Sequence, residues 1–318
     1  MPVHAFIFPG QGSQSVGMGR DLAATFAAAR EVFQEVDDTL GQKLSKLMFD
    51  GPAEDLTLTE NTQPALMAVS LAVLRVLQAE GGFVLPERAA LVAGHSLGEY
   101  SALAAAGSVG VASCARLLRL RGQAMQKAVA LGEGAMAALL GVELDAVQAI
   151  CADAAMGPDG RQVVEAANDN GGGQVVISGH REAVERAVEL AKTRGVKRAM
   201  LLPVSAPFHC TLMAPAAEVM AEALGAAEIT PPIVPLIANV TAAKATDPAL
   251  IRTLLVRQVT ETVRWRETML ACIHMGVDSF VELGAGRVLS GLVRRVTPDA
   301  RAAAAGTPAE IEALLKSL

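Results

Sequence analysis

At residues 89–99 the chain reads Ala89-Ala90-Leu91-Val92-Ala93-Gly94-His95-Ser96-Leu97-Gly98-Glu99. The apolar residues before Gly94 are typical of a short buried strand, and helical composition resumes from Glu99. The pentapeptide between them matches Gly-x-Ser-x-Gly, a tight strand-to-helix turn that exposes the serine hydroxyl. Glycine on either side of the serine avoids Cβ clashes in such a turn. The stretch therefore predicts an α/β fold with Ser96 as a catalytic nucleophile, and the alternative is a purely structural turn.

Strands and helices alternate around this turn. A short strand is expected over residues 3–8, and helices are expected over residues 21–40 and 61–79. This alternation favours a parallel α/β sheet.

The middle of the chain has a different pattern. Residues 135–204 read as strand, helix, strand, strand, helix and strand, the order of a ferredoxin-like unit. The polar and glycine-rich stretch 168–173 is expected to form the turn between the two middle strands. We therefore expect a discontinuous large α/β-hydrolase-like domain with a parallel sheet over residues 1–130 and 205–318. A small ferredoxin-like domain, residues 131–204, would be inserted in it, with substrate in the cleft between the two.

Composition excludes several classes of protein. The chain has 318 residues, of which 52% are hydrophobic and 19% charged, as in a globular domain rather than a disordered one. The net charge of −6 argues against a nucleic-acid binder. No apolar run reaches the roughly 18 residues of a membrane span, and the N-terminus does not read as a signal peptide. The four cysteines lie far apart, which indicates no metal site and a reducing compartment. We expect a cytoplasmic monomer with no cofactor and no membrane or nucleic-acid partner.

A serine nucleophile needs a base near neutral pH. His209 lies in a proline-bearing loop just after the last strand of the small unit, where the chain re-enters the large domain and faces the expected cleft. Its position favours it over the other four histidines, although a lone histidine is more often structural; these four are His4, His95, His180 and His274. No acid stands at a recognisable triad position. A Ser-His dyad oriented by a backbone carbonyl is therefore expected.

Two further features could belong to the same site. Arg121 lies on the helical stretch 113–129, where it is either a surface charge or a fork for a substrate carboxylate. The glycine-rich loop around Gln11 matches neither the dinucleotide nor the P-loop pattern. That loop is either a simple tight turn or a source of one N–H for an oxyanion, with Leu97 N–H as the other.

Several blocks stand in a fixed order along nearly the whole chain: Phe8-Pro9-Gly10-Gln11-Gly12-Ser13-Gln14, Thr62-Gln63-Pro64-Ala65, Gly94-His95-Ser96-Leu97-Gly98-Glu99-Tyr100, Arg121-Gly122-Gln123-Ala124-Met125-Gln126, Asn168 with Gly173-Gln174-Val175-Val176-Ile177-Ser178-Gly179, Pro207-Phe208-His209, Leu255-Val256-Arg257-Gln258 and Val281-Glu282-Leu283-Gly284-Ala285-Gly286. Together they resemble malonyl-CoA:acyl carrier protein transacylases, the acyltransferase family of fatty acid and polyketide synthesis. Ala285 stands where the family usually has proline.

The resemblance implies a role for each matching residue. Ser96 would be acylated, and His209 would be the base. The roles implied at the other positions are oxyanion-hole N–H donors at Gln11 and Leu97, a malonyl-carboxylate partner at Arg121, a pocket-lining residue at Gln63, and a backbone carbonyl that orients His209 at Gln258. Phe208 resembles the bulky residue of malonyl-selective members of the synthase branch.

The function implied is transfer of malonyl from malonyl-CoA to the pantetheine thiol of holo acyl carrier protein, with ping-pong kinetics, to supply fatty acid synthesis. The alternatives are a thioesterase or other hydrolase with the same turn, a transacylase that serves a polyketide or malonate-decarboxylase system, and a non-catalytic carrier-binding subunit. Two basic stretches, residues 192–198 and 287–295, are candidate docking sites for an acidic carrier protein.

Overall fold

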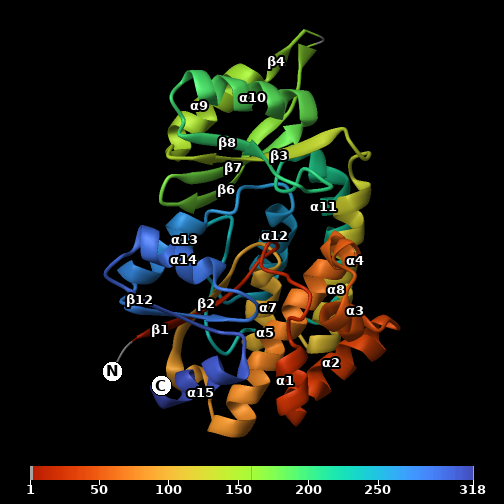
Figure 1. Ribbon diagram of the computed structural model, residues 1–318, viewed down its shortest axis with the longest axis vertical. Helices are drawn as coiled ribbons and strands as arrows, with labels where there is room; N and C mark the ends of the chain where they lie inside the picture. The colour runs from red at the N-terminus through yellow and green to blue at the C-terminus, as the bar shows by residue number, and fades with distance from the viewer. Residues whose placement is uncertain (1–2, 159, 318) are drawn as a thin grey trace.

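The larger of the two main sheets in the computed structural model lies at the centre of the fold (Figure 1). The structure describes residues 3–158 and 160–317. The order of the six strands is β10-β9-β2-β1-β11-β12, and every pair except β10–β9 is parallel. The strands are β1 (His4–Phe8), β2 (Ala89–Gly94), β9 (Leu236–Ile237), β10 (Lys244–Ala245), β11 (Ser279–Leu283) and β12 (Arg301–Ala305).

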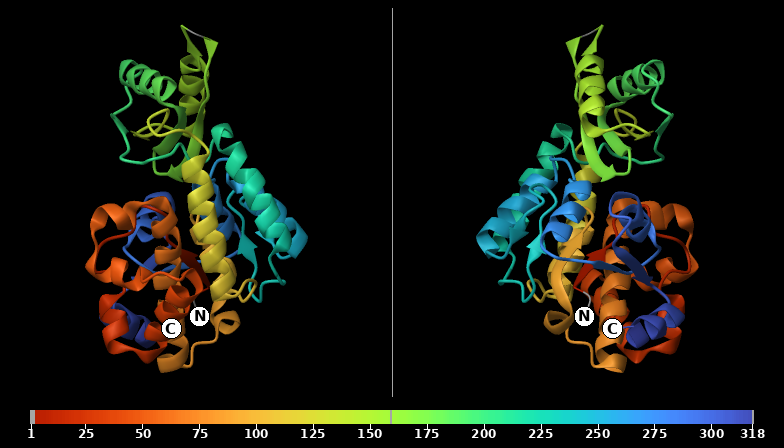
Figure 2. Two further views of the ribbon diagram at one scale, coloured as in Figure 1. Left: turned by 90° about the vertical axis from the view of Figure 1, so that its right-hand side faces the viewer. Right: turned by 90° about the vertical axis from the view of Figure 1, so that its left-hand side faces the viewer.

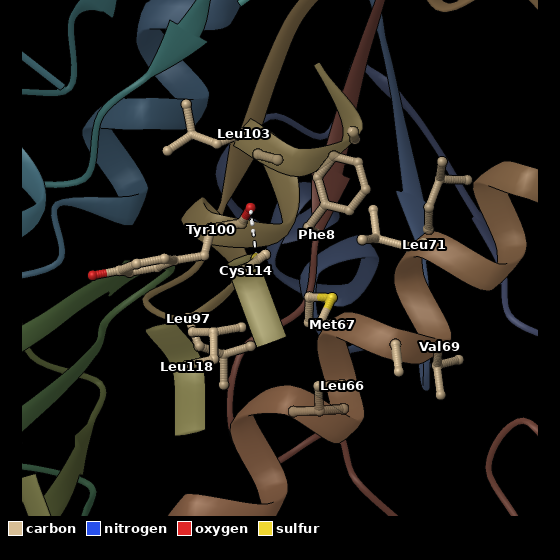
Figure 3. Close-up of a cluster of buried hydrophobic side chains, with 14 of the residues drawn as sticks. Phe8, Leu66, Met67, Val69, Leu71, Leu97, Tyr100, Leu103, Cys114 and Leu118 are labelled. Atoms are coloured by element: carbon tan, nitrogen blue, oxygen red, sulfur yellow. Dashed lines mark hydrogen bonds between the residues drawn. The ribbon is translucent and has the colours of Figure 1, made fainter. Parts of the chain in front are cut away.

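Both faces of this sheet are covered by helices. Alternate side chains of each strand point to opposite faces, so each face has apolar side chains that a helix covers. On β1, Phe6 and Phe8 belong to the core under α5 (Thr59–Gly81) and α8 (Val111–Lys127), while Ala5 and Ile7 pack toward α13 (Trp265–His274) and α14 (Val288–Val296). Figure 3 shows the first of these clusters, in which Phe8 of β1, Met67 of α5, Tyr100 of α7 (Gly98–Ala105) and Leu118 of α8 gather with Leu97, the residue before α7.

Helix α5 is long and apolar enough to cross a membrane, and it is the one such helix among the described residues. However, 72% of its most apolar window is buried inside the protein. It packs against α8 and α2, so the helix expected over residues 61–79 is confirmed and lies in the protein core.

The smaller sheet has the order β6-β7-β3-β8, and all its pairs are antiparallel. Its elements in chain order are β3 (Gly134–Leu140), α9 (Leu144–Ala154), β6 (Val164–Gly171), β7 (Gln174–His180), α10 (Arg181–Thr193) and β8 (Arg198–Leu201), with a short hairpin of β4 (Met156–Gly157) and β5 (Gly160–Arg161) after α9. This small sheet and its two helices form one end of the molecule (Figure 2). The expected fold class is therefore confirmed. The boundaries of the inserted domain, 131 and 204, stay a proposal.

The remaining helices surround the large sheet. They are α1 (Arg20–Thr25), α2 (Ala27–Leu40), α3 (Leu44–Asp50), α4 (Ala53–Thr57), α6 (Leu85–Arg88), η1 (Thr211–Met213), α11 (Ala214–Ala226), α12 (Pro248–Gln258) and α15 (Pro308–Ser317).

Two local expectations were wrong. The helix expected over residues 21–40 is two helices, because Phe26 has an extended backbone between them. The expected turn at 168–173 is shorter, because β6 continues to Gly171 and only Gly172 and Gly173 form the turn. Asn168, Asp169 and Asn170 are consequently strand residues, and all three are buried.

Candidate active site

The turn at Ser96 has the geometry that its glycines predict. Ser96 has a left-handed backbone with φ 53°. A Cβ at Gly94 would lie 1.9 Å from the carbonyl of Gly98, and a Cβ at Gly98 would lie 2.2 Å from the carbonyl oxygen of Phe8. Both positions therefore require glycine. The turn joins β2 directly to α7 and places the Ser96 side chain on the wall of a cavity.

Asn239, which follows β9, joins the two sides of this turn. Its Oδ1 accepts a hydrogen bond from Ser96 N–H at 2.8 Å, and its Nδ2 donates to the Gly94 carbonyl at 2.7 Å. The sequence analysis assigned no role to Asn239, because the residue belongs to no motif and lies 143 positions from Ser96.

His209 reaches Ser96 from the other half of the chain. Its Nε2 lies 2.8 Å from Ser96 Oγ, and its Nδ1 lies 2.8 Å from the backbone carbonyl of Gln258. Gln258 is the last residue of α12, where carbonyls have no partner within the helix. Because a carbonyl only accepts hydrogen bonds, Nδ1 carries the proton and Nε2 is free to accept the Ser96 O–H. No carboxylate hydrogen-bonds to His209 in the part of the chain that the structure describes, so the pair forms a dyad.

The surroundings of His209 keep it neutral. Burial is the main cause that lowers the pKa of the imidazole from 6.5 to about 3, and the positive charge of Arg121 is the second. A neutral imidazole at physiological pH is the form that can take a proton from a serine hydroxyl.

Arg121 is 1% exposed, so it is not a surface charge. Its Nη1 donates to Gln63 Oε1 at 2.8 Å, and its Nη2 donates to Gln258 Oε1 at 2.9 Å and lies 3.3 Å from Ser96 Oγ. The guanidinium also lies over the ring of Tyr100, 5.7 Å from the centroid. Within the described residues no carboxylate comes within 4.0 Å of Arg121, so its charge is buried without an ion-pair partner.

Two backbone N–H groups belong to residues of this cavity. Gln11 and Leu97 both line the cavity beside Ser96, and neither backbone N–H has an acceptor among the described residues. Leu97 immediately precedes α7, whose N-terminus favours negative charge. The arrangement can stabilise an oxyanion.

The cavity has a volume of about 320 Å³ and lies between the two sheets. The large sheet and its helices contribute Gln63, Phe208 and α14 residues, while β3, β6 and β7 contribute the opposite wall. All the residues assigned to the site from sequence except Gln258 line it directly. Lining residues that received no role from sequence are Gly10, Gly12, Ser13, His95, Met125, Met136, Asn168, Asn170, Gln174, Val176, Leu202, Val204, Val288, Leu289 and Leu292.

A hydrogen bond between two of these lining residues joins the two walls of the cavity. His95 Nε2 lies 2.9 Å from Asn170 Oδ1, so the turn at Ser96 is tied to β6 of the small sheet. The sequence missed Asn170 as a contact because the stretch 168–173 reads as a turn. Among the described residues no group of three or more histidine, cysteine or acidic side chains could hold a metal ion.

Comparison with known proteins decides the family. The acyl transferase domain family matches residues 5–310. The chain belongs to the acyl transferase family. A Bacillus subtilis malonyl CoA-acyl carrier protein transacylase is 46% identical to this acyl transferase over 99% of the chain and 96% of that protein.

Solved structures agree with this assignment. An acyl-carrier-protein-S-malonyltransferase from Bartonella henselae has a TM-score of 0.95 and 56% identity, covering 99% of both chains. A malonyl-transacylase in complex with its holo type II PKS acyl-carrier protein has a TM-score of 0.95 and 43% identity, covering 99% of this acyl transferase and 100% of that chain.

Proposed function

We propose that this acyl transferase moves the malonyl group of malonyl-CoA to the pantetheine thiol of holo acyl carrier protein, through a malonyl ester on Ser96. The observation that carries the proposal is the buried guanidinium of Arg121, which has no ion-pair partner in the described residues and lies 3.3 Å from Ser96 Oγ. A buried cation without a partner is costly, and the carboxylate of a malonyl group would supply one.

The first half-reaction forms the ester. His209 Nε2 takes the proton of Ser96 Oγ as the oxygen attacks the thioester carbonyl. The resulting oxyanion accepts hydrogen bonds from the N–H groups of Gln11 and Leu97, each worth roughly 10²–10³ in rate by analogy with other oxyanion holes. The imidazolium is stabilised through Nδ1–H by the Gln258 carbonyl. Collapse of the intermediate expels CoA thiolate, which takes the proton from His209.

The second half-reaction is the same chemistry with a different thiol. The pantetheine thiol enters the site that CoA has left and gives its proton to His209. The thiolate attacks the malonyl ester, and Ser96 leaves with the proton that His209 returns. Because the acyl donor and the acceptor thiol use the site in turn, the kinetics are ping-pong.

Arg121 selects the acyl group. Its two terminal nitrogens point toward Gln63, Gln258 and Ser96, so a carboxylate near Ser96 would meet a charged fork held from behind by two amides. An acetyl group would leave the charge of Arg121 unpaired, and an unpaired charge in a buried site strongly disfavours binding of that group. Gln63 and Phe208 shape the pocket around the malonyl group.

The carrier protein reaches the cavity past its rim. Of the two basic stretches, the one on α14 is favoured, because Arg295 contacts Gln174, which lines the cavity, at 3.2 Å. Both stretches contain ion pairs: Lys192 and Arg194 pair with Glu189 and Asp153, and Arg287 pairs with Glu310. We further propose that the enzyme acts as a cytoplasmic monomer in fatty acid synthesis, with no nucleic-acid or membrane partner; service in a polyketide or malonate-decarboxylase system is the alternative.

The experiment is an acyl-CoA panel with intact-mass detection. Brief exposure to malonyl-CoA is expected to add one malonyl group to the protein but not to Ser96→Ala, and holo carrier protein is then expected to remove it as malonyl-carrier. Release of free malonate without malonylated carrier would instead identify a hydrolase. An unmodified wild-type protein would identify a non-catalytic carrier-binding subunit.

A further inference from the structure

Glu99 is a buried carboxylate directly beneath the site, in the first turn of α7. It is 1% exposed. Its Oε2 accepts hydrogen bonds from Gln258 Nε2 at 2.7 Å and from the backbone N–H of Asn239 at 3.1 Å. Glu99 does not line the cavity, and the reaction described above does not use it. Its two partners, however, both hold groups that do take part.

The first partner, Gln258, has a side-chain amide that must donate a hydrogen bond at one end and accept one at the other. On one end, Nε2 donates to Glu99 Oε2 and, at 3.0 Å, to the carbonyl of Ser96. On the other end, Oε1 accepts from Arg121 Nη2 at 2.9 Å. A flipped amide would turn its NH₂ toward the guanidinium and its oxygen toward the Glu99 carboxylate. Both contacts would be repulsive, so Glu99 and Arg121 together fix a single orientation of the amide.

The same chain of contacts separates the two charges. Gln258 lies between the Arg121 guanidinium and the Glu99 carboxylate and hydrogen-bonds to both. A carboxylate in direct contact with Arg121 would occupy the place that a substrate carboxylate needs. The Gln258 amide between the two charged groups is a neutral acceptor for Arg121 Nη2, so the positive charge of Arg121 stays available for a ligand.

We propose that Glu99 is a positioning residue for acyl selection: through the Gln258 amide it holds Arg121 in the orientation that receives the malonyl carboxylate. The inference rests on the proposed function, because it takes Arg121 to be the group that recognises malonyl. Glu99 has no hydrogen bond to Ser96 Oγ or His209 among the described residues. Because its contact with Asn239 also supports the turn at Ser96, its role in acyl selection is measured by the malonyl-to-acetyl ratio, in which an effect common to both substrates cancels.

The test compares kcat/KM for malonyl-CoA with that for acetyl-CoA, measured by transfer to holo carrier protein. Glu99→Ala is expected to lower the malonyl-to-acetyl ratio by about tenfold or more, the scale of one lost charge-assisted hydrogen bond, chiefly through kcat/KM for malonyl-CoA. Glu99→Gln can keep an oxygen in the place of Oε2, so it is expected to retain the wild-type ratio within about threefold. The matched control is Ser101→Ala on the same helix, since the Ser101 hydroxyl is buried and has no hydrogen-bond partner among the residues that the structure describes; its ratio should equal that of wild type.

Gln258→Met supplies the same readout should Glu99→Ala not fold. It removes the amide, retains the backbone carbonyl that His209 uses, and is expected to lower the ratio as Glu99→Ala does. In an Arg121→Ala background, Glu99→Ala and Gln258→Met should change the ratio no further, because the group that Glu99 and Gln258 position is gone.

The outcomes separate the two proposals. A wild-type protein without malonyl transfer would overturn the proposed function, and an unchanged ratio in Arg121→Ala would remove Arg121 from the carboxylate site. If both behave as proposed, an unchanged ratio in Gln258→Met overturns the positioning role, as does an equal loss of malonyl and acetyl transfer in Glu99→Ala. A Glu99→Gln ratio as low as that of Glu99→Ala overturns it as well.

Discussion

Ser96 and His209 are 113 residues apart in the chain, yet Ser96 Oγ and His209 Nε2 lie 2.8 Å apart, and both residues have a left-handed backbone. Their φ angles are 53° and 57°, values that cost a non-glycine residue roughly 1–2 kcal/mol each. The surroundings must therefore hold them in place. For Ser96 the holding groups are Asn239 and the Gln258 side-chain amide, and for His209 the holding group is the Gln258 carbonyl, so Gln258 contacts both the nucleophile and the base.

Replacing the base tests this pair. His209→Ala is expected to lower the rate of Ser96 acylation by about 10²–10⁴, the usual contribution of a general base. Quenched-flow intact-mass measurement with malonyl-CoA follows that step directly. His274→Ala, at an exposed position on α13, is the control and should acylate at the wild-type rate. Equal rates in the wild type and His209→Ala would show that another group takes the proton.

The pH dependence of acylation reports the environment of the base. Since burial and Arg121 lower the His209 pKa to about 3, the imidazole is neutral above that pH. The wild-type kcat/KM should therefore show no loss near pH 6.5, the ordinary histidine value, when it is measured with acetyl-CoA between pH 5 and 8. Removing the nearby cation in Arg121→Ala raises the His209 pKa, so loss of activity on acidification should begin at a higher pH in that variant. An acid limb near pH 6.5 in the wild type would contradict the assignment.

The shape of the Arg121 side chain matters as well as its charge. Arg121→Lys keeps the positive charge but cannot hold Gln63 and Gln258 with a planar fork. We expect kcat/KM for malonyl-CoA to fall by about tenfold or more, with acetyl-CoA much less affected. Arg116→Lys, on the exposed face of the same helix, is the matched control. Full malonyl activity in Arg121→Lys would mean that charge alone recognises the substrate.

The parts of this site that the sequence predicted are those with a strong local cause. Gly94 and Gly98 predict the turn, because no other residue avoids the clashes there. The strand and the helix on either side are predicted from local apolar patterning. The order of strands and helices along the small unit was predicted in the same way, because each element has its own local pattern. Position in the chain already favoured His209 among the five histidines, whereas the choice of a substrate role for Arg121 over a surface charge needed the resemblance to a family.

The contacts that the sequence did not predict are tertiary. Asn239 joins the turn only because β9 lies beside β2, a pairing of segments more than 140 residues apart. Asn170 reaches His95 because β6 runs on through residues with a strong turn preference, with irregularities in its register on either side of Asn168 and Gly171. In both cases the sheet overrides the local signal, as it often does for strands.

Glu99 also links stability to pH. Burial raises the pKa of its carboxyl from 4.5 to about 7, although hydrogen bonds from Gln258 and Asn239 oppose the shift. Between these two values the folded protein binds a proton that the unfolded chain has released, so the free energy of unfolding falls as pH rises, by about 1.4 kcal/mol per pKa unit. Below pH 4.5 both states hold the proton, and above pH 7 both have lost it, so the penalty is constant on either side.

Glu99→Gln removes this ionisation and keeps a hydrogen-bond acceptor. Its stability relative to the wild type is therefore expected to increase from pH 5 to pH 8, with most of the change below pH 7. Urea unfolding at four pH values measures the difference, with Ser101→Ala as a buried control on α7 that has no titrating group. A constant difference between Glu99→Gln and wild type across this range would show that Glu99 ionises in the folded protein as it does in the unfolded chain.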